Sequence, residues 1–292
     1  MLFRSNNSPT PLINPGPTRL NPSFGAITYA QNDRRGNYNA LIFDVRGHFS
    51  RGYIDASYTR SSSKDDGLDY PDSENFNPNR YYGPSIFDVP NRFSLSFNYS
   101  LKGLNGGRGA VGYLTGGWGI SGTSIFQSGY PLTAGNENGF VALCQSGNVS
   151  NKQGCSQSDP AVSYAPGSGD YNGDGDNNDY PDVTSYAQSH NNKAWILGAI
   201  PKTDFANPTF GSEGNENAMQ FRGPNFYETN INFYKDTHLT ERVVFQFRFE
   251  VFNLFNRANY ANVDTNVPDG NFGAATASHE PRFWQLGGKL SF

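Results

Sequence analysis

The residues best suited to bind a metal lie in one acidic stretch, 170–179, which reads D-Y-N-G-D-G-D-N-N-D. Oxygen-bearing side chains recur at alternate positions, and Gly175 stands sixth, as in the first half of a calcium-binding loop. Pro181 occupies the twelfth position, where such a loop places a glutamate, so Asp179 or Asp182 would have to substitute. The alternative is a solvated turn of Asp, Asn and Gly residues. The predicted calcium ligands are Asp170, Asn172, Asp174, Asp176 and Asp179.

Two cysteines, Cys144 and Cys155, lie close together in a polar segment. In an oxidising compartment such a pair forms a disulfide that staples a loop, whereas in the cytosol both would remain free thiols. Neither cysteine has a histidine or a second cysteine pair at zinc-binding spacing beside it. We therefore predict a disulfide between Cys144 and Cys155.

No set of residues predicts catalysis. The four histidines, His48, His190, His238 and His279, lie in separate segments, and no nucleophile or metal-ligand spacing accompanies them. The glycine-rich turn 103–109 lacks the lysine and the following helix of a phosphate-binding loop. We expect no catalytic residue, no enzyme activity, and no cofactor apart from Ca²⁺ at the acidic loop.

The composition predicts strands joined by loops. The chain has 292 residues, of which 36% are hydrophobic and 15% aromatic, with 33 glycines and 18 prolines. Its mean hydropathy is -0.63, and no stretch approaches the roughly 18 consecutive apolar residues that a spanning helix needs. The net charge is -4 without a basic cluster, which excludes nucleic acid as a partner, because phosphate binding needs concentrated lysine and arginine.

Alternation of apolar and polar residues predicts about eight strands. Residues 242–251 read R-V-V-F-Q-F-R-F-E-V, which places valine and phenylalanine on one face and glutamine, arginine and glutamate on the other. The same alternation recurs in segments near the roughly 9–11 residues that cross a bilayer at a tilt. These segments centre on residues 41–48, 54–59, 93–101, 114–127, 227–233 and 284–292, with a weaker strand at 24–31.

Large apolar faces opposite polar faces fit a transmembrane β-barrel, with lipid outside and a wet lumen inside. The connections alternate between long (62–90, 128–224, 256–281) and short (50–52, about 104–107, 235–241). Such barrels alternate long extracellular loops with short periplasmic turns, which would put the C-terminus on the periplasmic side. We expect the charged lumen-face residues Asp44, Arg46, Arg248 and Glu250 to hydrogen-bond across the wall or to a plug rather than to contact a solute.

Several segments resemble TonB-dependent outer-membrane transporters of the Oar-like subgroup. Residues 248–256, R-F-E-V-F-N-L-F-N, are similar to a stretch near the end of these proteins. The C-terminal residues Gln285, Gly287, Leu290 and Phe292 resemble the signal read by the barrel assembly machinery. The further segments that carry the resemblance are 37–41, 88–93, 117–122 with 127–131, and 221–224 with 230–235.

The resemblance implies an all-β, antiparallel transmembrane barrel of about 22 strands, closed by an N-terminal plug, in the outer membrane of a Gram-negative bacterium. Residues 1–292 would supply only the C-terminal part of the wall, with 128–224 as a long extracellular loop. We find no plug segment, TonB box or signal peptide, and expect these to lie upstream. The implied partners are outer-membrane lipid, the assembly machinery, the TonB complex through that upstream part, and a small nutrient.

Two other interpretations stay open at this point. One is a free-standing structural or adhesive outer-membrane barrel of eight strands with long surface loops. The other is a secreted β-module stabilised by calcium, whose strands would alternate because a second protein layer covers their apolar faces. Transport of an oligosaccharide, a peptide or a metal chelate is the function that the resemblance favours.

Overall fold

The structure is a computed structural model, and it describes residues 35–66, 82–104, 109–135, 180–208, 214–217 and 219–292. It also gives the backbone of three short paired strands, β7 (Ala142–Leu143), β8 (Val149–Ser150) and β9 (Ser163–Tyr164). Among the described residues, no helix is long and apolar enough to span a bilayer. The predicted strand at 24–31, the acidic stretch 170–179 and both cysteines lie outside these residues.

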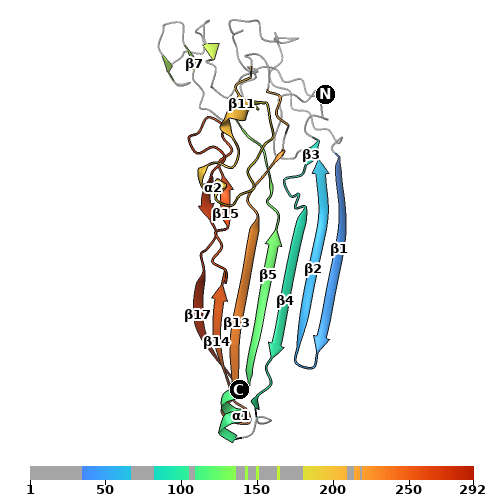
Figure 1. Cartoon of the computed structure of the whole chain (residues 1–292), viewed down its shortest axis with the longest axis vertical. Helices are drawn as coiled ribbons and strands as arrows, with labels where there is room; N and C mark the ends of the chain where they lie inside the picture. Colours follow the sequence, from blue (N-terminus) through green and yellow to red (C-terminus); the bar gives the residue numbers. More distant parts are fainter. Residues whose placement is uncertain are drawn as a thin grey trace, which may run out of the picture.

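One antiparallel sheet dominates the molecule, with its long strands side by side in the order β1-β2-β4-β5-β13-β14-β17 (Figure 1). A two-residue strand, β3 (Gly83–Pro84), pairs with β2. The long strands have 9 to 14 residues, which is enough to cross a bilayer. They are β1 (Gly36–Phe49), β2 (Gly52–Asp65), β4 (Asn91–Ser100), β5 (Trp118–Gln127), β13 (Phe226–His238), β14 (Val244–Phe252) and β17 (Phe283–Ser291).

The register confirms the predicted two-faced strands, because directly paired residues share one side of a sheet. Direct pairs join one residue from each of the seven long strands into a row across the sheet, and one such row is polar. The row one residue further along the strands faces the other side. The polar row is His48, Tyr53, Asn98, Ser121, Asn232, Glu250 and Gln285. The neighbouring row is Phe49, Gly52, Tyr99, Ile120, Phe233, Phe249 and Leu286.

The apolar face has no second protein layer over it within the described part of the chain. Leu41 and Trp284, at opposite ends of the sheet, are 58% and 64% exposed. The buried hydrophobic side chains all come from the connections between the long strands. The main cluster comprises Ala134, Ile200, Phe221, Val267 and Phe272, with Leu132 and Phe205 against it. The wall therefore exposes its apolar face, as a membrane protein does.

The long connections form a cap at one end of the sheet, opposite the C-terminus (Figure 1). Besides β7, β8 and β9, the described residues of 128–224 contribute four short strands and two short helices to the cap, together with a hairpin within 256–281. These elements are β6 (Pro131–Leu132), β10 (Asp182–Val183), α2 (Ala194–Leu197), η2 (Lys202–Asp204), β11 (Phe205–Ala206), β12 (Phe221–Arg222), β15 (Tyr260–Val263) and β16 (Ala275–Ser278).

Several strand boundaries were predicted wrongly. The connections were predicted to begin at Lys235 and Ser62, but β13 continues to His238 and β2 to Asp65. Leu114 and Thr115 were assigned to the strand that continues through Phe126, but they belong to a short helix, α1 (Gly109–Thr115). Gly117 adopts a φ of 76° between helix and strand, a left-handed conformation that glycine takes without steric cost. The chain turns there, and β5 begins at Trp118.

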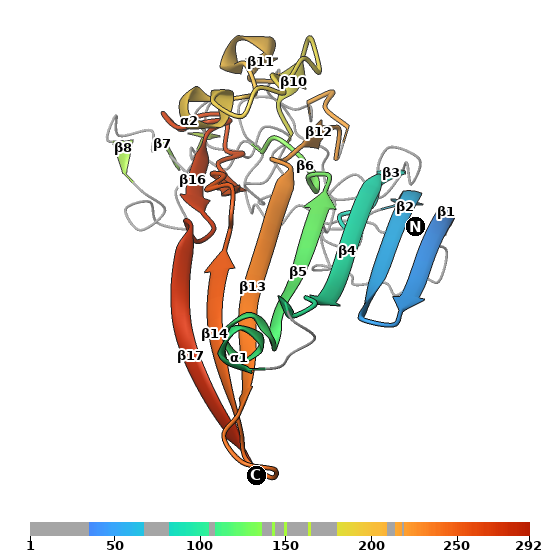
Figure 2. The ribbon, with the colours of Figure 1, turned by 60° about the horizontal axis from the view of Figure 1, so that its bottom comes forward.

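The two outer strands of the sheet lie far apart, as a view turned by 60° also shows (Figure 2). Within the described residues, β1 pairs only with β2, and β17 pairs only with β14. The described strands therefore form a wall segment with two edges.

Candidate functional site

The polar face of the wall is cross-linked by its own side chains. In the half formed by β13, β14 and β17, Gln246 Nε2 donates to Asp236 Oδ1 at 2.8 Å, and Arg248 Nε donates to Gln246 Oε1 at 2.6 Å. Gln285 Nε2 donates to Glu250 Oε2 on the neighbouring strand. Glu250 thus bonds across to the neighbouring strand as expected, whereas Arg248 bonds to Gln246 on its own strand.

At the other edge, the pairing of charges is looser. Arg46 Nε lies 3.6 Å from Asp55 Oδ2, and both side chains are largely exposed. Such an exposed ion pair contributes little to stability. The charged groups on this side of the wall are therefore available to a solute, to water or to another protein segment.

A shallow pocket of about 250 Å³ lies at mid-height on the polar face. Asn232 Nδ2 donates to Ser121 Oγ at 3.2 Å, while Asn232 Oδ1 is buried without a hydrogen-bond partner among the described residues. A buried amide oxygen without a partner is costly, so a ligand or water that donates a hydrogen bond would be favoured there. The polar side chains that line the pocket are Tyr53, Ser96, Ser121, Thr123, Asn230, Asn232 and Glu250.

An aromatic side chain bridges three strands below this pocket. Tyr234 pairs with Gly119, and its ring lies over this glycine. A β-carbon added to Gly119 would lie only 2.1 Å from the nearest ring atom. Its hydroxyl donates to Asn98 Oδ1 at 3.2 Å and lies 3.4 Å from Ser100 Oγ. The glycine leaves room for the tyrosine, which ties β13 across β5 to β4.

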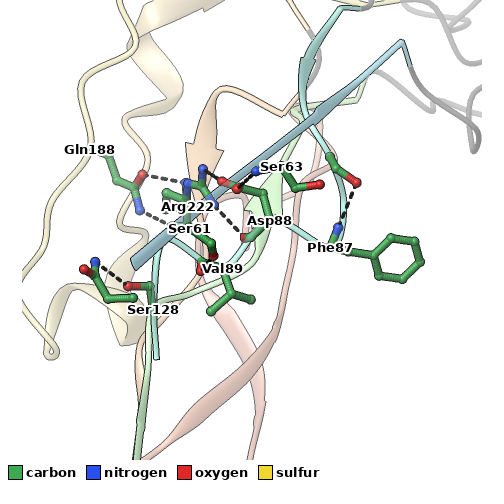
Figure 3. Close-up of polar contacts among 10 residues, drawn as sticks. Ser61, Ser63, Phe87, Asp88, Val89, Ser128, Gln188 and Arg222 are labelled. Carbon is green, nitrogen blue, oxygen red and sulfur yellow. Dashed lines mark hydrogen bonds and ion pairs between the residues drawn. The ribbon is translucent and has the colours of Figure 1, made fainter. Parts of the chain in front are cut away.

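A partly buried ion pair joins two of the long connections at the base of the cap (Figure 3). Arg222 Nη2 contacts Asp88 Oδ2, and Arg222 Nη1 donates to the Asp88 carbonyl oxygen at 2.8 Å. The Gln188 side chain accepts from the Arg222 backbone N–H at 2.9 Å and donates to the Arg222 carbonyl oxygen. Asp88 Oδ1 also accepts from the Ser63 N–H at 2.6 Å, which fixes the junction to β2.

The same junction continues along the rim of the sheet through short polar side chains. Ser61 Oγ donates to the Val89 carbonyl oxygen at 2.8 Å, and Asn91 Nδ2 donates to Ser128 Oγ at 3.1 Å (Figure 3). The end of the long connection 62–90 and the start of the connection 128–224 are thus held to the wall. Both Asp88 and Arg222 belong to segments that carry the family resemblance, although 134 residues separate them.

A fully buried carboxyl group, Glu216, lies in the cap. Its Oε1 accepts from the Ala134 N–H at 2.9 Å, and its Oε2 has no hydrogen-bond partner among the described residues. Burial raises the pKa of Glu216 to about 8, although the bond from Ala134 lowers it in part. The group is therefore mostly protonated at neutral pH. Sequence reasoning missed it, since nothing beside it in the sequence signals burial.

Three asparagines shape the end of β14 and the connection after it. Asn253 and Asn256 adopt φ values of 48° and 49°, which asparagine tolerates better than most residues. Asn253 Nδ2 donates to the carbonyl oxygens of Arg257 and Glu280 at 2.9 and 3.2 Å. Asn259 accepts from the Tyr227 N–H at 3.0 Å and donates to its carbonyl oxygen at 2.7 Å, extending the pairing of β13.

Only part of the predicted site residues can be placed. The predicted calcium ligands Asp170, Asn172, Asp174, Asp176 and Asp179, and the predicted disulfide partners Cys144 and Cys155, lie outside the described residues. Both assignments stay predictions. In the portion that the structure does describe, no group of three or more His, Cys, Asp or Glu side chains could hold a metal ion.

The predicted assembly-signal residues lie on or beside β17. Gln285 faces the polar side and bonds to Glu250, and Gly287 pairs with Arg248. Leu290 lies exposed on the apolar side, and Phe292 follows the strand with its side chain exposed. Their recognition by the assembly machinery stays a prediction.

The histidines are placed in two regions. His48 and His238 stand near the turn end of β1 and β13, respectively. His190 lies in the connection before α2, and His279 follows β16, where its ring contacts Phe226 edge-on at 5.0 Å. The absence of a catalytic residue remains an expectation.

A sheet with one wet face, one exposed apolar face and a loop cap at one end defines the wall of a transmembrane β-barrel. The sequence matches the outer membrane beta barrel domain family over residues 3–285, and the chain belongs to this family. It therefore resides in the outer membrane of a Gram-negative bacterium, as the strand pattern predicted.

Among solved structures, the chain is similar to P. aeruginosa FpvA in a complex with a heterologous pyoverdine and iron. The sequence identity is 12% and the TM-score is 0.40, with 93% of this chain and 21% of that chain covered. The chain thus spans about a fifth of the length of that structure. No curated protein matches the sequence.

Proposed function

We propose that this chain forms the C-terminal wall of a TonB-dependent transporter that moves a scarce nutrient across the outer membrane. The observation that carries the proposal is the polar row that crosses all seven long strands, from His48 to Gln285, opposite an exposed apolar face. A continuous polar surface toward the interior supports a solute path, because a polar nutrient must exchange its water for other donors and acceptors.

The edges of the sheet support a barrel larger than the described strands. Unpaired backbone groups at a strand edge are not tolerated in lipid, because no water is present to satisfy them. The free edges of β1 and β17 would therefore pair with further strands. A barrel of about 22 strands with an internal plug, as the family resemblance implies, provides such partners and places the TonB contact outside this chain.

The cap supports ligand capture on the outside of the cell. Long connections carry their own hydrophobic cluster around Phe221 and are fixed to the rim through Asp88 and Arg222. A cap held in this way presents a defined surface above the mouth of the wall. The substrate class remains open among an oligosaccharide, a peptide and a metal chelate.

The proposal is tested by uptake in the source bacterium. A strain that lacks the gene and a strain that lacks tonB should show the same growth defect when one nutrient class is limiting. Complementation with the wild-type gene should restore growth, and the variant Asn232→Leu, which fills the lumen pocket, should restore it only in part. A Leu286→Ile variant on the apolar face is the matched control and should behave as wild type.

The transport proposal would be overturned if the deletion strain grew as wild type on every nutrient class while wild-type cells displayed the protein on their surface. Growth defects that did not depend on tonB would favour the second candidate, a structural or adhesive barrel. The observation that favours this candidate is the packed cap itself, since a rigid outer surface can serve adhesion. A secreted β-module is not proposed, because the chain belongs to an outer-membrane barrel family.

A further inference from the structure

The short helix α1 has an unusual surface for a segment at the end of a barrel wall. It reads G-A-V-G-Y-L-T and carries no charged residue, and only Gly112 is buried. Val111, Tyr113 and Leu114 are 52%, 56% and 66% exposed. A helix that is apolar on all sides is normally buried in protein or in a membrane, and the described part of this chain does not bury it.

Two side chains fix α1 to the lipid-facing side of the wall. Lys235 and Trp118 are direct neighbours on β13 and β5, on the same side as Phe233 and Ile120. Lys235 Nζ donates to the carbonyl oxygens of Tyr113, Leu114 and Gly116 at 3.0, 3.0 and 2.8 Å. Trp118 Nε1 donates to the Leu114 carbonyl oxygen at 3.0 Å. The end of the helix therefore lies against the apolar face.

The lysine is unexpected on this face, and the helix explains it. A lysine on the lipid side is costly at the bilayer midplane and costs little near the interface. Lys235 stands near the turn end of β13, and its charge meets the carbonyl end of α1, where the helix dipole is negative. Its ammonium group also lies 5.1 Å from the centre of the Trp118 ring. The charge is thereby satisfied without reaching into bulk water.

We propose that α1 is an interfacial helix whose apolar side chains enter the periplasmic phospholipid leaflet beside the barrel. The surface of α1 is continuous with the apolar face of the wall through Trp118, and the exposed side chains of Leu101 and Leu104 extend it. An interfacial helix of this kind lies roughly 5–10 Å deep, at the boundary between headgroups and acyl chains. The contact of α1 with lipid follows from the membrane fold and does not depend on which substrate is transported.

The test uses the full protein that carries this chain, in nanodiscs of phosphatidylethanolamine and phosphatidylglycerol. Cys144 and Cys155 are replaced with serine, and an NBD fluorophore is attached through Leu114→Cys. We expect blue-shifted emission, and stronger quenching by a nitroxide at a shallow acyl position than by one at the bilayer centre. Leu197→Cys is the matched control, since Leu197 is a leucine that is 89% exposed in the cap, and its probe should report water.

A second pair of variants tests the attachment of α1 to the wall. Lys235→Met keeps the length of the side chain but removes the donor for three carbonyl groups, so lipid quenching at position 114 should fall. Lys102→Met removes an exposed charge near the same end of the wall and should leave the quenching unchanged. Heat-dependent gel migration verifies that each variant is folded.

Two results would overturn the proposal. The first is a probe at position 114 that emits as in water and is quenched by iodide as strongly as the probe at position 197. The second is a blue-shifted probe that no lipid nitroxide quenches, since a protein surface and not lipid would then cover α1.

Discussion

At the scale of single residues, Glu216 is a pH-dependent weak point of the cap. An unfolded glutamate loses its proton near pH 4.5, whereas the buried group does so at about pH 8. The stabilising effect of the protonated group is therefore complete below pH 4.5 and is lost progressively as the pH rises toward 8. In that window the cap becomes steadily less stable as the pH rises.

We predict that Glu216→Gln makes the cap more resistant to proteolysis than wild type at pH 8 and removes most of the pH dependence. Glutamine has a similar shape and can accept the bond from Ala134, but it cannot ionise. Limited proteolysis of the reconstituted protein between pH 5 and pH 9 measures this. Glu228→Gln on β13 serves as a control. An unchanged pH dependence in the Glu216 variant would show that another group controls the cap.

Calcium binding by the acidic stretch 170–179 also depends on individual side chains. If the oxygens of 170–179 bind Ca²⁺, EGTA should lower the thermal stability of the protein, and added Ca²⁺ in excess should restore it. Asp174→Ala should remove the EGTA effect, whereas Asp269→Ala in another loop of the cap should retain it. An identical melting temperature with and without EGTA would leave the acidic stretch as a solvated turn.

The sequence indicated several site residues but not how they combine. Asp88, Arg222 and Asn253 stood out through segments of the family resemblance, yet their partners could not be foreseen. Asp88 and Arg222 meet because the connections 62–90 and 128–224 end on the same rim of the sheet. Asn253 bonds to Glu280 because β14 and β17 are neighbours. Such contacts depend on long-range pairing, which local patterns do not encode.

At the scale of elements, strands were predictable where alternation is strict, and other elements were not. All seven long strands were foreseen from period-two patterns, because each has one face in lipid and one in water. The helix α1 was taken as the start of a strand, since Leu114, Trp118 and Ile120 also fit alternation. The hairpin β15–β16 was taken as loop, because four-residue strands are too short to show a period.

We predict that Gly119→Val weakens the wall by about 1–3 kcal/mol, the usual cost of overpacking. The new side chain would occupy the space of the Tyr234 ring and break the bond from Tyr234 to Asn98. Tyr234→Phe, which keeps the ring but removes the hydroxyl, should cost less. Urea unfolding in lipid, followed by the shift in gel migration, compares the two. Equal stability of Gly119→Val and wild type would mean that the tyrosine can move aside without loss.

At the scale of the whole molecule, the stability of the wall in a membrane depends on closure of the sheet into a barrel. Seven neighbouring strands give a wall whose polar side is lined by Asn, Ser and Glu and whose apolar side is exposed. The same seven strands leave the backbone groups at the outer edges of β1 and β17 without strand partners within the described residues. In a bilayer each such group costs several kcal/mol, so two open edges outweigh the gain from the apolar face.

We therefore predict that residues 1–292, produced alone and refolded in detergent or lipid, do not form a closed, heat-modifiable barrel. The chain should instead show strand pairing between molecules at the edges of β1 and β17, detectable as oligomers cross-linked between cysteines placed at Ile42 and Leu286. If the proposed upstream strands exist, supplying them should suppress these oligomers, because they would occupy both edges. A monomeric product that migrates faster before boiling than after it would contradict this. Such a product would require that the residues outside the described strands close a small barrel themselves, which would favour the structural or adhesive candidate over the transporter.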